Sequence, residues 1–593
     1  MARYVFDIET DGLLHQLTKV HSLVVYELDS GTVVSAHHER IEPLVRELME
    51  ADELIGHNIT AFDLLALKKV YPWFTYDLDK VTDTLILSRM VFPNVKDWDA
   101  TRGRNKVPRK RWGSHSLEAW GYRTGFLKGD FGATTDWQEW TPEMQEYCEQ
   151  DVRVNVAVYE RFREEGWSQQ ALTMEVWFQH IMALQEQSGF PFDRDAAVTL
   201  YAQLLKDRTE LDKEIQPMVP DWYADMGPFV PKVNNKTFGY ESGVEFTKVK
   251  HMSFNPGSRH QIADRLQKLY DWKPTVFTPG GSPQIDENVL GTINHPLAQL
   301  LEKRFLINKR ISQLSEGDGA WLRLERDGRI HGYVNTLGTV TGRCSHSSPN
   351  MAQIPAVRSL YGEECRALFY APPGWVQVGA DASGLELRCL GHYMARFDGG
   401  AYINILLNAD IHTENQKAAG LDTRDQAKTF IYAFLYGAGD EKIGSIVGKG
   451  SREGKKLKQS FLNKTPALKK LRDLVIQKTR TQGYLLGIDG RKLHVRSEHS
   501  ALNVLLQSAG GLLVKYATVW LYQELLERGY DWGKDFVFVA HVHDEYQLQC
   551  REEIAAEVGE LAVEAFRSAG RMFDWRCPLD GEYKIGHNWA ETH

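Results

Sequence analysis

The sequence predicts a multidomain α/β protein, and three observations support this prediction. The chain has 593 residues, which at about 150 residues per domain is enough for several separate cores. Hydrophobic residues make up 42% of the chain and charged residues 25%, an ordinary globular composition. Alternating apolar runs typical of strands are interleaved with stretches of helical spacing along the whole chain.

The first part of the chain is expected to form one α/β domain that ends near residue 170. Apolar runs at 4–8 and 20–28 lie on either side of a turn and predict two strands. Helical spacing of apolar residues follows in 83–92, 117–125 and 142–166.

The middle of the chain is expected to be mainly helical. Two helical patterns fill 171–214 around a turn at 188–193. The polar, Pro/Gly-rich segment at 217–256 is expected to be a long loop or a small excursion. Helices are predicted again at 260–269 and 296–314, and a strand-and-turn region at 327–343.

Strands and helices are mixed beyond residue 370. In 375–397 an alternating run ends at Asp381 and then changes to helical spacing. The residues predicted on one face of this strand are Val376, Val378 and Ala380. Two alternating runs within 535–550 predict a β-hairpin with Asp544 and Glu545 near its turn.

The charge balance argues against a histone-like polyanion binder, because the net charge is −9 and the pI about 6.2. Basic residues nevertheless concentrate in two runs, with six Lys or Arg in 101–111 and nine in 449–472. Either run suits a solvated helix face or a phosphate contact, and both interpretations stay open.

No membrane segment and no export signal are expected. The longest stretch without Asp, Glu, Lys or Arg is His499–Val514, which is too short and polar to span a bilayer. The N-terminus lacks an apolar signal region. Six cysteines without a CxxC pair indicate a reducing cytosol and buried thiols rather than disulfides or a zinc site.

Four acids and a tyrosine form a candidate hydrolytic site. Asp7 and Glu9 lie two apart on a predicted strand, so both side chains leave one face, although such pairs are common by chance. Asp63, Tyr147 and Asp151 strengthen the case, the last two at i, i+4 on a predicted helix. Four acids together repel one another unless divalent cations bind them. Two such cations would promote phosphodiester hydrolysis, with Tyr147 orienting the attacking water.

A second candidate site combines a helix with two aspartates. Four side chains lie at successive i+4 steps of a predicted helix: Arg424, Lys428, Tyr432 and Tyr436. Two cations beside two aromatic rings suit a triphosphate at one end and a base or sugar at the other. Asp381 and Asp544 are then the expected carboxylate pair for two Mg²⁺ ions. The alternative is a packed helix whose basic side chains extend into solvent.

These motifs resemble those of known enzymes. The acids and Tyr147 resemble, in order and context, the exonuclease motifs of DEDD-type 3′ to 5′ proofreading nucleases with a tyrosine. DASGLELR, RDQAKTFIYAFLYG and HDE resemble the three motifs of family A DNA polymerases, with a greater likeness to replicative polymerases of short-tailed phages of the T-seven type. Further similar stretches are GFPFD, FNPGSR, TGRCSHSSPNMAQIP and LLQSAGGLL, so the resemblance covers nearly the whole chain.

The resemblance implies roles for individual residues. Asp381 and Asp544 would ligate two Mg²⁺ ions with the Ala382 carbonyl, and the four N-terminal acids would bind two more. Glu386 would exclude a ribose 2′-hydroxyl, and Tyr432 would stack near the incoming sugar and tolerate dideoxynucleotides. The other nucleotide contacts would be His412, Arg424, Lys428 and Tyr436. The primer-template contacts would be Arg343, His499, Asn503 and Gln507, each of which could instead be a buried hydrogen-bonding group.

The resemblance also implies an architecture: a ribonuclease-H-like exonuclease domain followed by a right-hand polymerase domain. The expected boundaries are 1–170 for the exonuclease, 171–369 for the thumb and its connection, 370–420 and 495–593 for the palm, and 421–494 for the fingers. The expected ligands are primer-template DNA and dNTPs. The expected state is a monomer in the cytosol of an infected bacterium, with a replicative helicase-primase as a further candidate partner. Thioredoxin dependence is not expected, because the segment at 217–251 is much shorter than the thioredoxin-binding insertion of the T-seven type.

Three other functions compete with this interpretation. A repair nuclease whose second half only binds DNA is disfavoured by Asp381, Lys428 and Asp544. A single-subunit RNA polymerase is disfavoured by Glu386 and the proofreading motifs. A purely structural DNA-binding protein leaves both acidic clusters unexplained.

Overall fold

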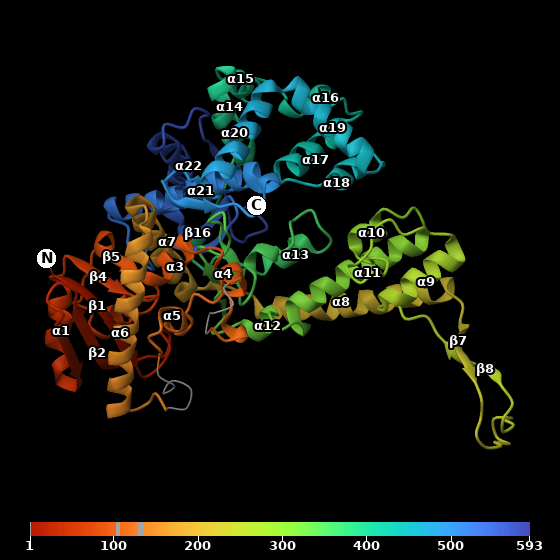
Figure 1. The fold of residues 1–593 in the computed structure, drawn as a ribbon, viewed down its shortest axis with the longest axis horizontal. Helices are drawn as coiled ribbons and strands as arrows, with labels where there is room; N and C mark the ends of the chain where they lie inside the picture. The colour runs from red at the N-terminus through yellow and green to blue at the C-terminus, as the bar shows by residue number, and fades with distance from the viewer. Residues whose placement is uncertain (1, 102–106, 129–135) are drawn as a thin grey trace. The chain divides into compact units, whose positions relative to one another are not determined.

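The computed structural model describes residues 2–101, 107–128 and 136–593, and the chain divides into two compact units (Figure 1). The larger unit combines Met1–Pro191, His331–Gln353 and Tyr370–His593, and the smaller unit combines Phe192–Ile330 and Ile354–Phe369. All residues predicted above to be functional therefore lie in the larger unit. Of the basic run at 101–111, residues 102–106 lie outside the described residues.

A five-stranded mixed sheet organises the N-terminal part of the larger unit. Its order is β3-β2-β1-β4-β5, with β1 antiparallel to β2 and parallel to β4. The strands are β1 Arg3–Thr10, β2 Val20–Glu27, β3 Val33–His37, β4 Glu53–Gly56 and β5 Val81–Asp83. The helices are α1 Ile41–Leu48, α2 Asp63–Val70, α3 Thr84–Val91, α4 Val95–Thr101, α5 Leu117–Thr124, α6 Pro142–Glu165 and α7 Gln169–Ser188. Both predicted strands and all three predicted helices of this part are confirmed.

Local sequence sets the ends of α6, the helix that carries Tyr147 and Asp151. The Thr141 hydroxyl accepts a hydrogen bond from the Met144 N–H at 3.2 Å, and Pro142 occupies the first turn, where its missing N–H costs nothing. The helix ends at Gly166, whose φ of +67° is accessible to glycine. The buried face of α6 packs on β1 and β2, so this helix brings its acid to the strand that carries Asp7.

An antiparallel sheet of order β15-β16-β12-β17 organises the C-terminal part of the larger unit. Its strands are β12 Trp375–Ala382, β15 Phe536–Val542, β16 Glu545–Arg551 and β17 Gly581–Gly586. The predicted strand and hairpin are thus confirmed. The polar face of β12 is largely buried as well: Gln377 is fully buried and donates a hydrogen bond to Gln547 Oε1 at 2.8 Å, and of the strand's residues only Asp381 is exposed.

Helices and two small hairpins complete the larger unit. The helices are α14 Leu385–Asp398, α15 Ala401–Asn408, α16 Ile411–Ala419, α17 Arg424–Leu435, α18 Asp440–Ser445, α19 Ser451–Lys464, α20 Pro466–Gln482, α21 Ala501–Glu527 and α22 Ala555–Met572. The hairpins are β10 Tyr333–Asn335 with β11 Ser345–Ser347, and β13 Tyr484–Leu486 with β14 Lys492–His494. By length and composition α21 could cross a membrane, but 83% of its apolar window is buried inside the protein, as in a core helix.

The smaller unit is mainly helical, with one two-stranded hairpin and the short strand β9 Arg329–Ile330. Its helices are α8 Arg194–Ile215, α9 Arg259–Tyr270, α10 Glu287–Gly291, α11 Pro296–Ile311, α12 Trp321–Leu324 and α13 Gly362–Ala367. An ion pair between Arg304 and Asp212 joins α11 to α8, which run side by side (Figure 1). The expected loop at 217–256 contains a hairpin of β7 Trp222–Phe229 and β8 Phe246–Met252. Its strands lack a buried face, as the exposed Tyr223 and Val249 show, so no periodic pattern marked them in the sequence.

A buried histidine in β15 makes the stability of the larger unit sensitive to pH. Burial lowers the pKa of His541 to about 3, and its Nδ1 has no hydrogen-bond partner among the described residues. The unfolded chain, with an ordinary pKa of about 6.5, binds more protons between pH 6.5 and 3, so stability is lost as pH falls through this window. At pH 5 the loss amounts to about 2 kcal/mol.

We therefore expect His541→Gln to lose less thermal stability than the natural protein when pH is lowered from 7 to 5. Thermal unfolding of both proteins at the two pH values measures this difference. An identical loss in both would show that this histidine does not contribute to the pH dependence.

Candidate active sites

Three acids of the N-terminal sheet meet at β1. Asp7 and Glu9 leave the same face of this strand, as expected from their spacing. Asp63 is the first residue of α2, and its Oδ1 accepts a hydrogen bond from the Ile8 N–H at 3.3 Å. The structure therefore brings Asp63 beside the strand residue that lies between the other two acids.

Burial raises the pKa of every acid in this cluster, and the charges of the neighbouring acids add to the shift for Asp7 and Glu9. Burial raises the pKa of Glu9 to about 8, of Asp63 to about 7 and of Asp151 to about 6. Burial, followed by the charge of Asp63, raises the pKa of Asp7 well above its usual range. Asp151 Oδ1 is buried and has no hydrogen-bond partner within the described residues. Crowded carboxylates with an unsatisfied oxygen fit a divalent cation.

Lys128 belongs to this cluster, although no feature of the sequence indicated it. Its ammonium group forms an ion pair with Asp151 and lies 4.7 Å from the centre of the Tyr147 ring. It follows α5 in an irregular segment, where spacing rules do not apply. The contact arises only because this segment folds back onto α6, and it neutralises part of the negative charge.

We expect Lys128→Met to increase the affinity of the cluster for divalent cations by about tenfold, because it removes a positive charge that competes for Asp151. Isothermal titration of the protein with Mn²⁺ measures this affinity. Lys19→Met, which removes a lysine outside the cluster, serves as the control. Weaker Mn²⁺ binding by Lys128→Met would show instead that the lysine organises the ligands.

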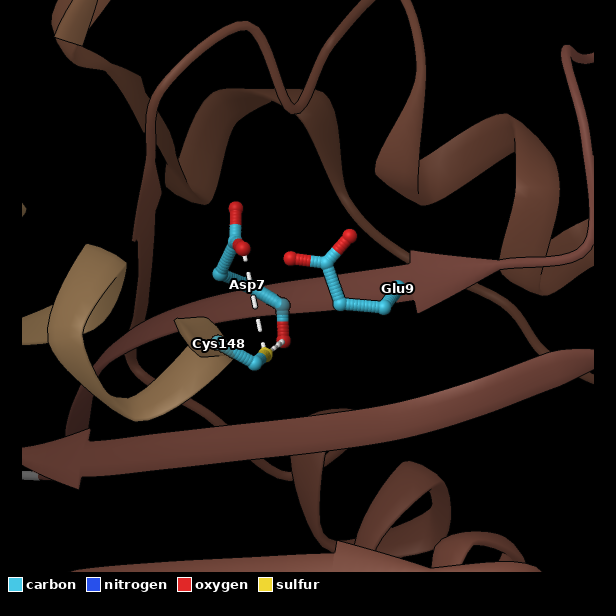
Figure 2. Close-up of side chains that lie close together, drawn as sticks. All are labelled: Asp7, Glu9 and Cys148. Carbon is cyan, nitrogen blue, oxygen red and sulfur yellow. Dashed lines mark hydrogen bonds between the residues drawn. The ribbon is translucent and has the colours of Figure 1, made fainter. Parts of the chain in front are cut away.

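Cys148 lies beneath Asp7 and Glu9 on the buried face of α6 (Figure 2). Ligand atoms of these three residues lie within 4.8 Å of one another. The thiol donates to the Asp7 carbonyl oxygen at 3.3 Å, and burial raises its pKa well above the ordinary value. Sulfur is a soft ligand that hard cations such as Mg²⁺ disfavour, so Cys148 supports Asp7 through this hydrogen bond rather than competing for the cation. Of the six cysteines, five are buried as expected and Cys344 is partly buried.

Two neighbours of these motifs have structural roles. Asp83 caps α3 and accepts hydrogen bonds from the N–H groups of Asn58 and Thr60 at 2.9 and 3.0 Å. His57 is hydrogen-bonded to Thr84 at 2.9 Å, and burial lowers its pKa to about 3. A neutral buried ring of this kind fits a local structural role for His57.

The second acidic site lies where β12 meets the turn of the β15–β16 hairpin. The Ala382 N–H donates to the Asp544 carbonyl oxygen at 3.0 Å, and Asp381 pairs with Glu545 in the strand register. Burial raises the pKa of Asp381 to about 7, and the charge of Asp544 adds to this shift. The predicted carboxylate pair is therefore adjacent, and its unneutralised negative charge fits a site for divalent cations.

The backbone at both ends of this junction is unusual. His543, immediately before Asp544, has a φ of +57°, which few non-glycine residues adopt and which is often found at functional sites. Gly384 has the same φ at the start of α14 and allows the chain to reverse directly after Asp381. This reversal places Glu386 in the first turn of α14. Glu545 Oε2 lies 2.9 Å from His593 Nδ1, so this carboxylate is not free to act as a third ligand beside Asp381 and Asp544.

Glu386 connects the aspartates to the predicted nucleotide and DNA contacts. The Tyr436 hydroxyl donates to Glu386 Oε1 at 3.0 Å, and Arg343 Nη2 lies 3.8 Å from the same oxygen. The negative charge of Glu386 also raises the pKa of Asp544 after the larger effect of burial. Arg343 Nε further donates to the Gln507 carbonyl oxygen at 3.3 Å. The structure thus gathers these residues around one carboxylate.

Helix α17 carries the predicted nucleotide-binding stripe. The Tyr432 ring lies 6.3 Å from His412 and stacks at 6.5 Å on Tyr436, which is the residue that ends the helix. Arg424 forms an ion pair with Asp410 at 2.6 Å, so it is engaged rather than free in this structure. Lys428 is exposed and pairs with none of the described acids. Neither Arg424 nor Lys428 contacts Asp381 or Asp544 here.

A groove of about 690 Å³ lies beside the C-terminal end of α17. Its lining includes His499 and Asn503, and the Asn503 side-chain amide donates to the Tyr436 carbonyl oxygen at 3.4 Å. Four basic residues from the run at 449–472 also line it: Lys455, Lys458, Lys469 and Arg472. Lys458 is bound to Asp440 at 2.9 Å. Part of the basic run at 449–472 therefore lines this groove, and the run is not only a solvated helix face.

Comparisons with known proteins agree with this arrangement. The family model described as DNA polymerase family A matches residues 239–591. DNA-directed DNA polymerases of Enterobacteria phage T3 and Escherichia phage T7 are each 40% identical to this chain, over 99% of it and 100% of the relative. Both alignments have 704 positions, more than the 593 residues of this chain, so each relative carries segments that this chain lacks.

A solved structure shares the fold. It is the POL domain of Pol1 from M. smegmatis in complex with DNA primer-template and dNTP, and it superposes with a TM-score of 0.74 at 18% identity. The match covers 100% of this chain and 96% of that chain.

Proposed function

Because this chain belongs to DNA polymerase family A and is a template-dependent DNA polymerase, we propose that Asp381 and Asp544 form its nucleotidyl-transfer centre. The observation that supports this proposal most strongly is the contact between the end of β12 and the hairpin turn, which makes the two aspartates neighbours. Homology to phage enzymes over the full chain favours a replicative role in an infected bacterium.

The polymerase site has the groups needed for transfer of a nucleotide to a primer end. Enzymes of this family depend on metal ions, usually Mg²⁺, and we propose that Asp381, Asp544 and the Ala382 carbonyl hold two of them. When bound, the ions lower the pKa of the primer 3′-hydroxyl and neutralise the leaving pyrophosphate. The triphosphate is held by His412, Arg424 and Lys428. To bind a phosphate, Arg424 leaves its ion pair with Asp410.

Sugar selection follows from the contacts of Glu386. Its carboxylate is held by the Tyr436 hydroxyl beside Tyr432, and in this position it would exclude a ribose 2′-hydroxyl. Tyr432 stacks near the incoming sugar, and its phenol compensates for a missing 3′-hydroxyl in dideoxynucleotides. Arg343, His499, Asn503 and Gln507 contact the primer-template, and all four lie near Tyr436, the adjoining groove or α21.

A separate site in the N-terminal domain removes nucleotides from the primer 3′ end. Asp7, Glu9, Asp63 and Asp151 hold two Mg²⁺ ions, which when bound promote attack of water on the last phosphodiester. Tyr147 orients the water, and Lys128 places a positive charge beside it. This proposal is supported by the buried acids and by the unsatisfied Asp151 oxygen.

The proposed partners follow from the same likeness. Primer-template DNA and dNTPs are the substrates, the protein acts as a monomer, and a helicase-primase is a candidate partner. The short β7–β8 hairpin occupies the place in the sequence where a thioredoxin-binding insertion is expected, so processivity depends on this hairpin or on the basic groove.

A labelled primer-template incubated with Mg²⁺ tests the proposed function. We expect extension with dNTPs but not with rNTPs, and 3′ shortening when nucleotides are omitted. Shortening without any extension would support the repair nuclease, and extension with rNTPs would support an RNA polymerase.

A further inference from the structure

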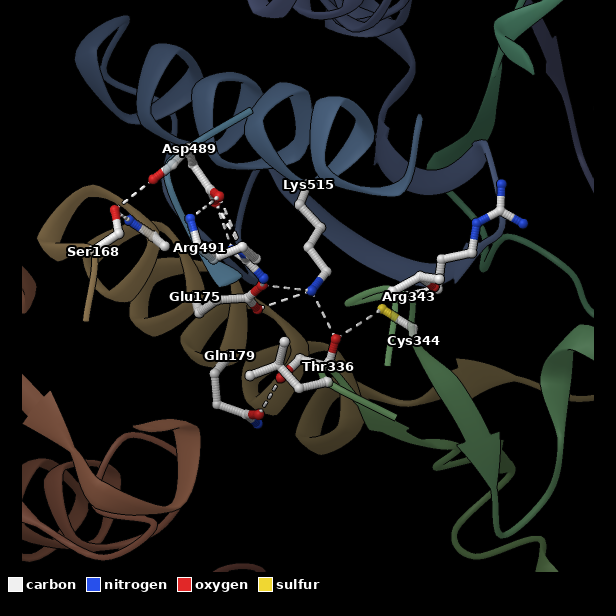
Figure 3. A network of polar contacts seen from close by, with 12 residues as sticks. Ser168, Glu175, Gln179, Thr336, Arg343, Cys344, Asp489, Arg491 and Lys515 are labelled. Carbon is white, nitrogen blue, oxygen red and sulfur yellow. Dashed lines mark hydrogen bonds and ion pairs between the residues drawn. The ribbon is translucent and has the colours of Figure 1, made fainter. Parts of the chain in front are cut away.

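Four buried charged side chains form a cluster that the proposed mechanism does not use (Figure 3). They are Glu175 of α7, Asp489 and Arg491 of the segment between β13 and β14, and Lys515 of α21. None exposes more than 3% of its side chain. Burying an ion costs several kcal/mol, and apolar replacements of such clusters are often no less stable. A cluster of this kind therefore calls for a role besides stability.

All donors of Lys515 are used within this cluster. Its ammonium group donates to both carboxylate oxygens of Glu175 at 2.8 and 2.9 Å and to the Thr336 carbonyl oxygen at 2.7 Å. Arg491 donates to Glu175 Oε1 at 2.6 Å and is itself paired with Asp489. An ammonium has three N–H groups, so these contacts fix its direction completely.

Thr336 is the point at which the cluster meets the polymerase site. It follows β10 and starts the loop 336–344 that leads to β11. The Thr336 hydroxyl donates to Gln179 at 2.9 Å, so this residue is held at two atoms. The Thr336 carbonyl also accepts from the Cys344 thiol at 3.7 Å, a weaker contact within the loop. A displacement of Lys515 would therefore remove the charged contact that holds the start of the loop to α21.

The same loop carries Arg343 at its other end. Arg343 donates to the Gln507 carbonyl oxygen at 3.3 Å and lies 3.8 Å from Glu386. Gln507 and Lys515 are both on α21, about two helical turns apart. The loop is thus attached to one rigid helix at both ends, and Arg343 faces the carboxylate proposed to select the sugar.

We propose that Glu175 and Lys515 are positioning residues for nucleotide addition, which act by holding the loop 336–344 so that Arg343 lies against Glu386. Neither residue contacts Asp381 or Asp544. The charged cluster supplies a rigid, direction-specific attachment that an apolar core would not. The inference rests on the proposed roles of Arg343 and Glu386.

A double-mutant cycle tests this inference through the steady-state kinetics of single-nucleotide addition. We expect Lys515→Met to lower kcat by about tenfold or more with little change in the KM for dNTP, because a misplaced Arg343 stabilises the transition state less. In an Arg343→Ala background the same change is expected to cost less than twofold. Glu175→Gln keeps the shape of the side chain but removes its charge. It should lower kcat by a smaller factor, and this loss should also depend on Arg343. This variant replaces Lys515→Met in the test if Lys515→Met does not fold.

The control removes another buried ion pair of the larger unit. Arg123 and Asp99 expose 1% and 0% of their side chains, and Arg123→Met should lower the unfolding temperature without coupling to Arg343→Ala. Equal losses from Lys515→Met with and without Arg343 would overturn the inference, because the two residues would then act independently. An unchanged rate for Arg343→Ala alone would overturn the role of Arg343 and the inference with it. A loss of kcat in Lys515→Met that largely disappears in the Arg343→Ala background would support both the role of Arg343 and the inference.

Discussion

Asp381→Asn is expected to lower the rate of primer extension by about 10³-fold or more while 3′ shortening of the same DNA continues. Asparagine keeps the size of the side chain but removes the charge that would hold a divalent cation beside Asp544. The neighbouring acid cannot replace it, because Glu545 is already bound to His593. Single-turnover extension of a labelled primer with Mg²⁺ and dNTPs measures the loss, and omission of dNTPs measures shortening.

Asp580→Asn is the matched control for this variant. Asp580 lies near the same end of β12 as Asp381, where its carbonyl oxygen accepts the Ser383 N–H, but its carboxylate pairs with Arg567 at 2.8 Å. We expect less than a twofold change in extension. A comparable loss in the control, or loss of shortening in Asp381→Asn, would contradict an independent polymerase site.

Asp7→Ala is expected to lower 3′ shortening by about 10³-fold or more and to leave the rate of extension unchanged. Asp7 lies at the centre of the acid cluster, where Asp63 and Glu9 raise its pKa after the larger effect of burial. Its removal takes one ligand from the proposed cation site, and Cys148 is a poor substitute because a soft sulfur ligand binds Mg²⁺ weakly. Release of labelled 3′ nucleotides from single-stranded DNA measures the loss.

The comparison for Asp7→Ala is Asp29→Ala, an acid of the same domain whose partner is Arg3 at 2.5 Å. Shortening by this variant should equal that of the natural protein. If Asp7→Ala also stopped extension, the two activities would share a site or the domain would have unfolded, and thermal unfolding separates these two outcomes.

The two proposed sites differ in how much of them could be predicted from sequence. In the polymerase site, Asp381 ends an alternating run and Asp544 lies at a hairpin turn, so local periodicity was enough to place both at strand ends. The stripe on α17 was predicted from spacing alone, and the structure shows Tyr432 and Tyr436 stacked at 6.5 Å. The hairpin at 222–252 was missed, because its exposed strands lack the alternation that burial on one face imposes.

By itself, the sequence determined the helices and strands that have clear apolar periodicity and the spacing that puts Asp7 with Glu9 and Tyr147 with Asp151. These features depend on neighbours within a few residues, where chain geometry is regular. The tertiary structure decided which distant residues join them: Lys128 at Asp151, Cys148 under Asp7, and Lys515 between Glu175 and Thr336. Such contacts depend on how separate elements pack, and the spacing of residues within one element does not encode them.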